Sequence, residues 1–134
     1  MIERYTLPEM KRIWSRENGY KKWLEIEIVT AEVMAELGQI PKDAAEKIRA
    51  KADFSIERID EIEKRTRHDI LAFLEAVYET LGDESKYVHK GLTSSDVKDT
   101  ATSMLLKEAG EHILEEIKKL KDAIGKRAIE HKDT

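Results

Sequence analysis

The chain has 134 residues, of which 40% are hydrophobic and 39% are charged. This composition is typical of a soluble, helix-rich protein that is long enough for one domain with a real core. The formal net charge of −4 argues against a general nucleic-acid binder, which would normally show a basic face. The chain contains no cysteine, which excludes disulfides and thiol chemistry.

The N-terminal residues 1–7 carry early charges and no apolar core, so they do not have the pattern of a signal peptide. No run approaches the ~20 apolar residues that a membrane-spanning helix needs. The sequence therefore predicts a cytoplasmic protein with no membrane partner.

Helical periodicity begins early in the chain. A short helix is expected from Pro8 to about Trp14, because proline suits the first helical position. Ser15 can cap a second helix, whose apolar residues recur at three- and four-residue steps until Gly38. After a turn, Pro41 can open a third helix.

Three more helices are expected in the rest of the chain. Ser55 can cap the fourth, in which isoleucines stand three residues apart. Residues 66–69 form a candidate cap with an acid at the third helical position, so a fifth helix should follow and end at Gly82. Residues 82–90 are predicted to be a polar connector.

The last helix, from Ser95 to about His131, is the longest. At 1.5 Å per residue it would be roughly 55 Å long and would outrun the five short helices before it. Its far half, with apolar residues at 4-3-4 spacing, must therefore pack against something outside this chain. The apolar positions concerned are Ile113, Ile117, Leu120 and Ile124. The sequence thus predicts an all-α fold, with a domain boundary near Thr93 that separates residues 1–92 from 93–134.

Residues 91–101 form a loop that becomes a helix. Gly91 permits an unusual backbone angle, and three consecutive hydroxyl residues from Thr93 are good N-cap residues. Unpaired N–H groups at a helix start, beside hydroxyls, make a donor-rich pocket for a carboxylate or phosphate. An ordinary capped helix start explains the same composition, and both interpretations remain open at this point.

The histidines do not form a metal site by their spacing. They are His68, His89, His112 and His131. None is paired with another at metal-ligand spacing, and although Glu108 shares a helix face with His112, no zinc or di-iron pattern results. His112 and His131 are expected to be solvated surface groups. At His68 two interpretations are open: simple helix capping, or a ring that Asp69 orients for proton transfer.

Arg4 and Tyr5 form an early basic and aromatic pair. An arginine fork suits phosphate geometry and a tyrosine hydroxyl can add a donor, although most such pairs simply lie at the surface. The sequence contains no Gly-rich phosphate loop, nucleophile elbow or Ser-His-Asp arrangement. From the residues alone, the prediction ends at a helical domain with an anion pocket near Thr93 and Ser94.

Three segments together resemble one family of enzymes. They are Gly-Leu-Thr-Ser-Ser-Asp-Val-Lys-Asp-Thr-Ala at 91–101, Thr-Arg-His-Asp at 66–69 and Arg-Tyr at 4–5. The first segment resembles the fumarase/aspartase superfamily. The other two favour the adenylosuccinate lyase family over fumarases, aspartases, argininosuccinate lyases and cycloisomerases, and the similarity runs over essentially the whole chain.

The resemblance implies a purine-biosynthesis enzyme that eliminates fumarate from adenylosuccinate and leaves AMP. It also implies cleavage of the succinylated carboxamide ribonucleotide, no metal or organic cofactor, and a homotetramer with active sites drawn from three subunits. By the same resemblance, Arg4 and Tyr5 hold the nucleotide phosphate, and Thr93 and Ser94 bind a succinyl carboxylate. The nucleotide site is lined by Arg67, His68 and Asp69, with His68 a candidate for proton transfer and His89 at the rim.

The resemblance also implies that the chain is incomplete as an enzyme. The family's general-acid histidine and its catalytic serine loop would lie beyond Thr134, so residues 93–134 would be the truncated first helix of a central bundle. Lys90 stands where the family has an apolar or aromatic residue. The 134-residue chain alone is therefore expected to be inactive. Two alternatives remain: another lyase of the superfamily, or a non-enzymatic helical interaction module.

Overall fold

The structure, a computed structural model, describes residues 2–134 apart from the side chain of Glu3. The described residues form helices and contain no strand, which confirms the all-α prediction. The α-helices are α1 (Pro8–Ile13), α2 (Arg16–Glu36), α3 (Lys42–Lys51), α4 (Ile56–Thr66), α5 (Asp69–Tyr78) and α6 (Ser94–Glu130). Two 3-10 helices accompany them, η1 (Glu3–Tyr5) and η2 (Asp83–Tyr87).

Local sequence signals set most of the helix ends. Ser15 caps α2 by accepting the N–H of Asn18 at 3.1 Å, and Ser55 caps α4 by accepting the N–H of Arg58 at 3.3 Å. Gly38 follows α2 with a φ of 71°, a left-handed conformation that glycine adopts without a steric penalty. These three predicted boundaries are confirmed.

The prediction for residues 66–69 was wrong in its register. Helix α4 runs through Thr66, and Arg67 closes it in the left-handed conformation, with a φ of 52°. His68 is then the N-cap of α5, and Asp69 is its first helical residue rather than the third. The cause is the continuity of α4: Thr66 belongs to its last turn, and therefore the next cap falls two residues later.

Two further differences concern segments between the long helices. Helix α5 ends at Tyr78, not near Gly82, and the connector predicted at 82–90 contains the 3-10 helix η2. The 3-10 helix η1 before α1 was not predicted. Both 3-10 helices are short and tightly wound, a form that sequence periodicity does not reveal.

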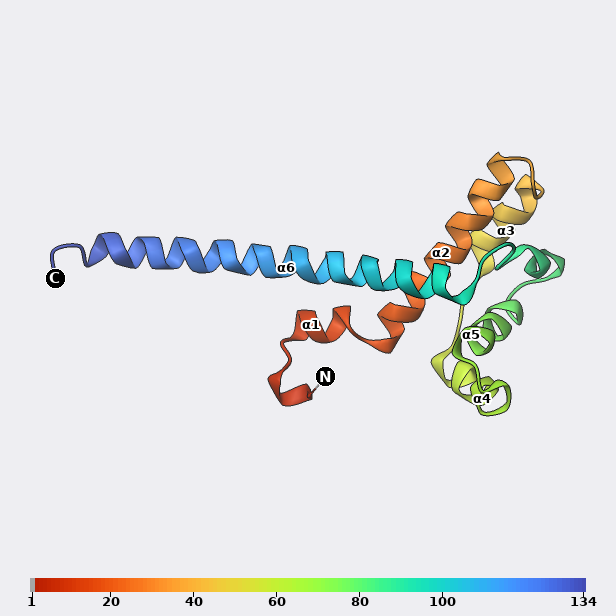
Figure 1. Cartoon of the computed structure of the whole chain (residues 1–134), viewed down its shortest axis with the longest axis horizontal. Helices are drawn as coiled ribbons and strands as arrows, with labels where there is room; N and C mark the ends of the chain where they lie inside the picture. Colours follow the sequence, from red (N-terminus) through yellow and green to blue (C-terminus); the bar gives the residue numbers. More distant parts are fainter. Residues whose placement is uncertain (1) are drawn as a thin grey trace.

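The molecule consists of a long projecting helix, α6, and a compact head that α2 to α5 form around its N-terminal end (Figure 1). Helices α2 and α3 lie on one side of this end of α6, and α4 and α5 lie on the other side. Helix α1 runs beneath the first half of α6 and contacts it. The core of the head is centred on an aromatic cluster of Tyr20, Trp23, Phe54 and Phe73. Phe73 is fully buried, so α5 lies at the middle of this core.

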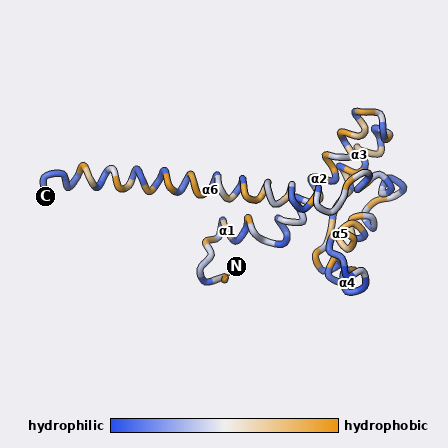
Figure 2. The backbone as a smooth tube through the Cα atoms, in the orientation of Figure 1, coloured by the Kyte–Doolittle hydropathy of each residue, from blue (hydrophilic) through white to orange (hydrophobic). Residues whose placement is uncertain are grey.

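The far half of α6 leaves the head. Apolar and polar residues alternate along it to its C-terminal end (Figure 2), yet no side chain from Glu111 to Glu130 is buried. Met10 and Leu7 of the α1 region border a groove with Ile113 and Ile117, but most of the stripe has no covering within residues 2–134. The predicted exposure of this stripe is confirmed, whereas the domain boundary near Thr93 stays a prediction. Within residues 2–134, no helix has the length and apolar character to cross a membrane.

Candidate active site

The start of α6 is a capped helix N-terminus. Thr93 is the N-cap; its N–H donates to Oδ2 of Asp96 at 2.9 Å, and the two residues form a capping box. The hydroxyl of the half-buried Ser94 has no hydrogen-bond partner among residues 2–134. The capped start is therefore confirmed. It is compatible with an anion pocket, because the positive end of the helix and the Ser94 hydroxyl remain available to a ligand.

The loop before α6 has an unusual backbone. His89 has a φ of 60° and Gly91 a φ of 78°. Gly91 fits the prediction, and its φ rather than lack of space requires glycine, because an added Cβ would meet only Met34 Cε at 3.5 Å. The left-handed conformation of His89 was not predicted. A side chain with a Cβ adopts it at a cost of about 1–2 kcal/mol, so other contacts must hold it.

Those contacts come from Glu27 in α2. Its carboxylate accepts the backbone N–H of His89 at 2.8 Å through Oε2, and Oε1 lies 2.6 Å from the ring Nδ1. Glu27 is 1% exposed. Burial raises the pKa of Glu27, and the hydrogen bonds from His89 offset only part of this effect. The loop that leads into Thr93 is thus anchored to α2 by both the backbone and the ring of His89.

Glu27 was not predicted as a site residue, although the sequence contains a signal for it. Glu27 stands four residues after Trp23 and four before Ala31, which places its carboxylate on the apolar stripe of α2. A charged side chain on a buried face requires a partner. The sequence did not show that the partner was His89, because 62 positions separate the two residues.

Residues 66–69, here called the second motif, lie where α4 meets α5. Arg67 is exposed. The ring of His68 caps α5, with Nδ1 accepting the N–H of Leu71 at 3.4 Å, so the capping interpretation of His68 is confirmed. The Oδ1 atom of Asp69 lies 3.6 Å from the same Nδ1, which is too long for a hydrogen bond. Asp69 therefore does not orient the His68 ring in this structure.

Asp69 instead pairs with Lys98 in the first turns of α6, where Nζ lies 2.7 Å from Oδ2. Burial raises the pKa of Asp69, but hydrogen bonds from Lys98 and the Ile70 N–H, together with the Lys98 charge, outweigh it and leave the pKa below its ordinary value. Lys98 also lies 6.0 Å from the centre of the Trp23 ring. Lys98 joins the second motif to the helix that carries Thr93 and Ser94, and it was not predicted as a site residue.

Asp69 and Trp23 also border an open groove of about 430 Å³ between α2 and the later helices. Its other lining residues include Arg16 and Glu63. Arg16 is engaged by an ion pair with Asp60. The groove therefore has one wall in the head core and another in the second motif.

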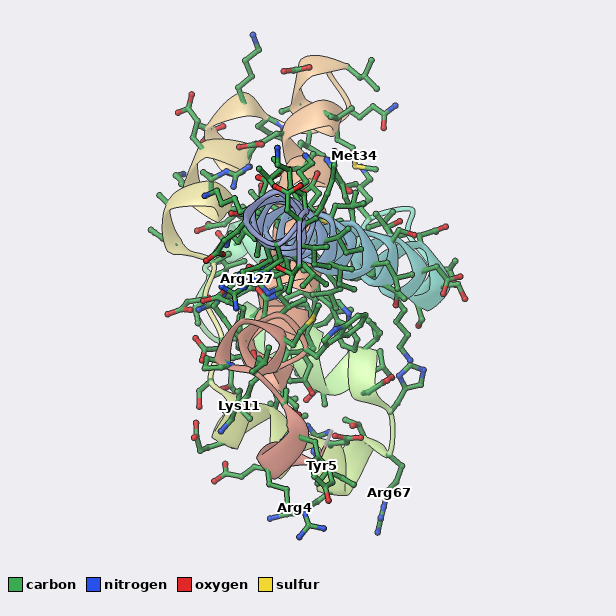
Figure 3. All side chains as sticks on the ribbon, turned by 90° about the vertical axis from the view of Figure 1, so that its left-hand side faces the viewer. Arg4, Tyr5, Lys11, Met34, Arg67 and Arg127 are labelled. Atoms are coloured by element: carbon green, nitrogen blue, oxygen red, sulfur yellow. The ribbon has the colours of Figure 1, made fainter. Side chains whose placement is uncertain are left out.

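The third motif, which consists of Arg4 and Tyr5, lies away from the other two segments in one copy of the chain. Arg4 and Tyr5 are exposed in η1, and the Arg4 guanidinium stacks 4.8 Å from the centre of the Tyr5 ring. Figure 3, which looks along the long axis, shows Arg4, Tyr5 and Arg67 on the same lower side. Figure 1 shows η1 displaced along α6 from α4 and α5. One copy of the chain does not bring these side chains together with Arg67.

Both remaining histidines were predicted to be solvated, and only His131 is exposed. His131 is exposed at the end of α6, and the half-buried His112 borders the groove beside α1. Glu108 does not face His112 in a metal site but binds Arg12 at 2.9 Å and Lys22 at 3.1 Å. Within residues 2–134, no group of three His, Asp or Glu side chains has the arrangement of a metal site.

The described residues thus form an all-helical head and a long projecting helix with a hydroxyl-rich start. The chain belongs to a family of lyases, whose model, described as "Lyase", matches residues 3–134. Over all 134 residues it is 55% identical to the adenylosuccinate lyase of Streptococcus mutans serotype c and 54% identical to the adenylosuccinate lyase of Bacillus subtilis strain 168. It spans 31% of the length of each of these relatives.

A solved structure has a similar fold. The crystal structure of a fumarate lyase from Mesorhizobium sp. BNC1 matches with a TM-score of 0.76 and 29% sequence identity. The match covers 85% of this chain and 28% of that one. The arrangement of the head and the long helix therefore occurs in a larger protein of the same class.

Proposed function

We propose that this chain is the N-terminal part of an adenylosuccinate lyase, a cytoplasmic enzyme of purine biosynthesis. It would eliminate fumarate from adenylosuccinate to give AMP, and from the succinylated carboxamide ribonucleotide. The observation that carries this proposal is the 54–55% identity to two adenylosuccinate lyases over the whole of the chain. The chain contains the three segments, at residues 4–5, 66–69 and 91–101, on which the resemblance rests.

The reaction is a β-elimination. A base removes the proton beside a carboxylate, the C–N bond breaks as the C=C bond of fumarate forms, and an acid protonates the departing nitrogen. Thr93 and Ser94 would bind a carboxylate of the succinyl group. The proposal is supported by their position at the positive end of a helix of 37 residues, because a helix N-terminus with hydroxyls beside it suits a bound carboxylate.

The nucleotide would occupy the region of the second motif. Arg67 is exposed and offers a planar fork of donors that matches a phosphate or ribose edge. His68 and Asp69 would line the same region, with Lys98 holding Asp69 in an ionised state through their 2.7 Å pair. His68 is a candidate for proton transfer, because its other ring nitrogen is not used in capping. His89 would lie at the rim of the site.

Arg4 and Tyr5 would bind the nucleotide phosphate in a site that another copy of the chain helps to form. This role fits their exposure and their distance from the second motif in one copy. It implies a homo-oligomer, and the family resemblance suggests a homotetramer. The exposed stripe of α6 is a surface through which such an assembly could form.

The decisive experiment is to express the complete reading frame that encodes this chain, incubate the purified protein with adenylosuccinate, and measure AMP and fumarate by chromatography. Equimolar release of both supports the proposal. Fumarate release from a different succinyl substrate, without AMP, would identify another lyase of the superfamily. The similar fold of the fumarate lyase structure is the reason to test this alternative. No reaction and no affinity for AMP or fumarate would favour a non-enzymatic helical module.

A further inference from the structure

The buried Glu27 pairs with the partly buried His89 in the loop that leads into the candidate active site. The two oxygens of one carboxylate hold two groups of one residue: the backbone N–H at 2.8 Å and the ring Nδ1 at 2.6 Å. When Glu27 is ionised, its carboxylate only accepts hydrogen bonds, so the 2.6 Å contact then requires a proton on Nδ1. The pair therefore selects the tautomer or charge state of His89 in which Nδ1 is protonated.

The other ring nitrogen of His89 is left for a ligand. Nε2 has no hydrogen-bond partner among residues 2–134, and the His89 side chain is 19% exposed. With Nδ1–H donated to a carboxylate, Nε2 carries a lone pair in the neutral ring and becomes a donor when it takes up a proton. An adjacent carboxylate stabilises the resulting imidazolium, as in other carboxylate–histidine pairs.

The backbone gives an independent reason to connect this pair with function. Among residues 2–134, only Arg67 and His89 are non-glycine residues with a positive φ. Both belong to segments of the candidate active site. Strained backbone of this kind persists only where its surroundings fix it, and it concentrates at functional sites. At His89 the buried carboxylate of Glu27 supplies that constraint.

We infer that Glu27 is a positioning residue: it fixes His89 with Nδ1 protonated, so that Nε2 faces an anionic oxygen of the substrate beside the start of α6. This inference rests on the proposed function for the identity of the substrate. It assigns a role in the site to a residue of α2, which none of the three motifs contains. Because Glu27 is 1% exposed, its role is to act through the His89 ring and not by contact with the substrate.

The substitution Glu27→Gln tests the inference with little change in shape. The amide oxygen can still accept the His89 N–H, but the amide NH₂ group would then face Nδ1 and donate to it. The ring would be forced into the opposite tautomer, with the proton on Nε2. We expect kcat/KM of the complete enzyme to fall at least about 10-fold to 100-fold, the range seen when a metal-ligating histidine loses its hydrogen-bond partner.

A double-mutant cycle separates positioning from a general structural effect. His89→Asn is the suitable second substitution, because asparagine tolerates the left-handed conformation. If Glu27 acts through the ring, Glu27→Gln should cost little more in the His89→Asn background. Glu84→Gln is the matched control, since Glu84 is the other buried glutamate of the described chain and should leave kcat/KM unchanged. An equal loss in both backgrounds, or a folded Glu27→Gln enzyme with wild-type kcat/KM, would overturn the inference.

A spectroscopic measurement keeps the outcome independent of activity. Nitrogen-15 NMR of labelled histidine in the 134-residue chain reports which ring nitrogen of His89 is protonated. A protonated Nδ1 in the wild type supports the inference even if Glu27→Gln does not fold, whereas a neutral ring with the proton on Nε2 overturns it. A wild-type enzyme that makes no AMP would instead refute the proposed function.

Discussion

Asp69 at the start of α5 and Lys98 in α6 form an ion pair of 2.7 Å that connects two segments of the candidate site. Each side chain is partly exposed, so solvent screening limits the contribution of the pair to stability. Its main effect is geometric, because it fixes the start of the long helix against the α4–α5 corner. The same pair helps to hold the pKa of Asp69 below its ordinary value.

We expect Lys98→Met to lower the free energy of unfolding by about 0.5 kcal/mol near neutral pH, the usual size for a partly exposed ion pair. The folded-state pKa of Asp69 lies below its ordinary value of 3.8, so this contribution is present above about pH 4 and is lost as the pH falls through the lowered pKa. Urea unfolding of both proteins across that range is the measurement. Lys126→Met, at an exposed position far along α6, is the control. A loss from Lys98→Met that stayed constant down to acid pH would contradict the ion-pair explanation.

Thr93→Ala combined with Ser94→Ala should impair catalysis of the complete enzyme much more than folding. Each hydroxyl that binds a charged oxygen contributes about 1.5–3 kcal/mol, so kcat/KM should fall about 100-fold or more. The lost cap should cost only about 1 kcal/mol of stability. Steady-state kinetics and thermal unfolding of the same preparations provide the comparison.

The adjacent hydroxyl supplies the control for that experiment. Ser95→Ala removes an exposed side chain one residue further along α6 and should leave both kinetics and stability near the wild type. If the double variant lost its unfolding transition but kept normal kinetics at low temperature, the hydroxyls of Thr93 and Ser94 would be structural only.

The features that the sequence predicted correctly depend on neighbouring residues. Ser15 and Ser55 cap the helices that follow them, and Gly38 ends α2, because each choice is decided within about one helical turn. The register at residues 66–69 was missed because it depends on where α4 ends. Periodicity alone does not place a helix end to the residue.

Single residues of the candidate site could be predicted from the sequence, but the long-range contacts between them could not. The hydroxyls at the start of α6 could be identified from local composition. The partner of Asp69 could not, because Lys98 lies 29 positions away and reaches it only after α5 and α6 have packed. Glu27 and His89 are separated even further along the chain. Pairs of this kind depend on tertiary structure, for which one sequence offers only the hint of a charge on an apolar face.

The 134-residue chain alone should release no fumarate from adenylosuccinate. One copy of the chain does not bring Arg4 and Tyr5 to the second motif, and the chain spans 31% of the length of its relatives. The measurement is fumarate release by the purified chain, with the protein expressed from the complete reading frame as the positive control. Turnover by the 134-residue chain that His68→Ala abolished would show that the described residues contain a complete catalytic set.

Self-association of the chain should occur through the far half of α6. Four apolar side chains on one stripe there are 48–60% exposed; they are Ile113, Ile117, Leu120 and Ile124. Full burial of such a side chain contributes about 1.5–3 kcal/mol, so covering the exposed half of each should contribute roughly half of that. Spacing of 4-3-4 suits left-handed packing of one helix against another. We therefore expect analytical ultracentrifugation to show oligomers at micromolar concentration.

Two charge-bearing variants locate the surface responsible. Ile117→Glu with Leu120→Lys places charges on the stripe and should yield a monomer, because a charge buried at an interface without a partner is costly. Glu115→Lys with Asp122→Lys reverses two existing charges on the opposite face of the same helix and should associate like the wild type. If the first pair of substitutions left association unchanged, or the second abolished it, the contact would lie elsewhere. A wild-type monomer at high micromolar concentration would show that the apolar stripe of α6 is not by itself sufficient for assembly.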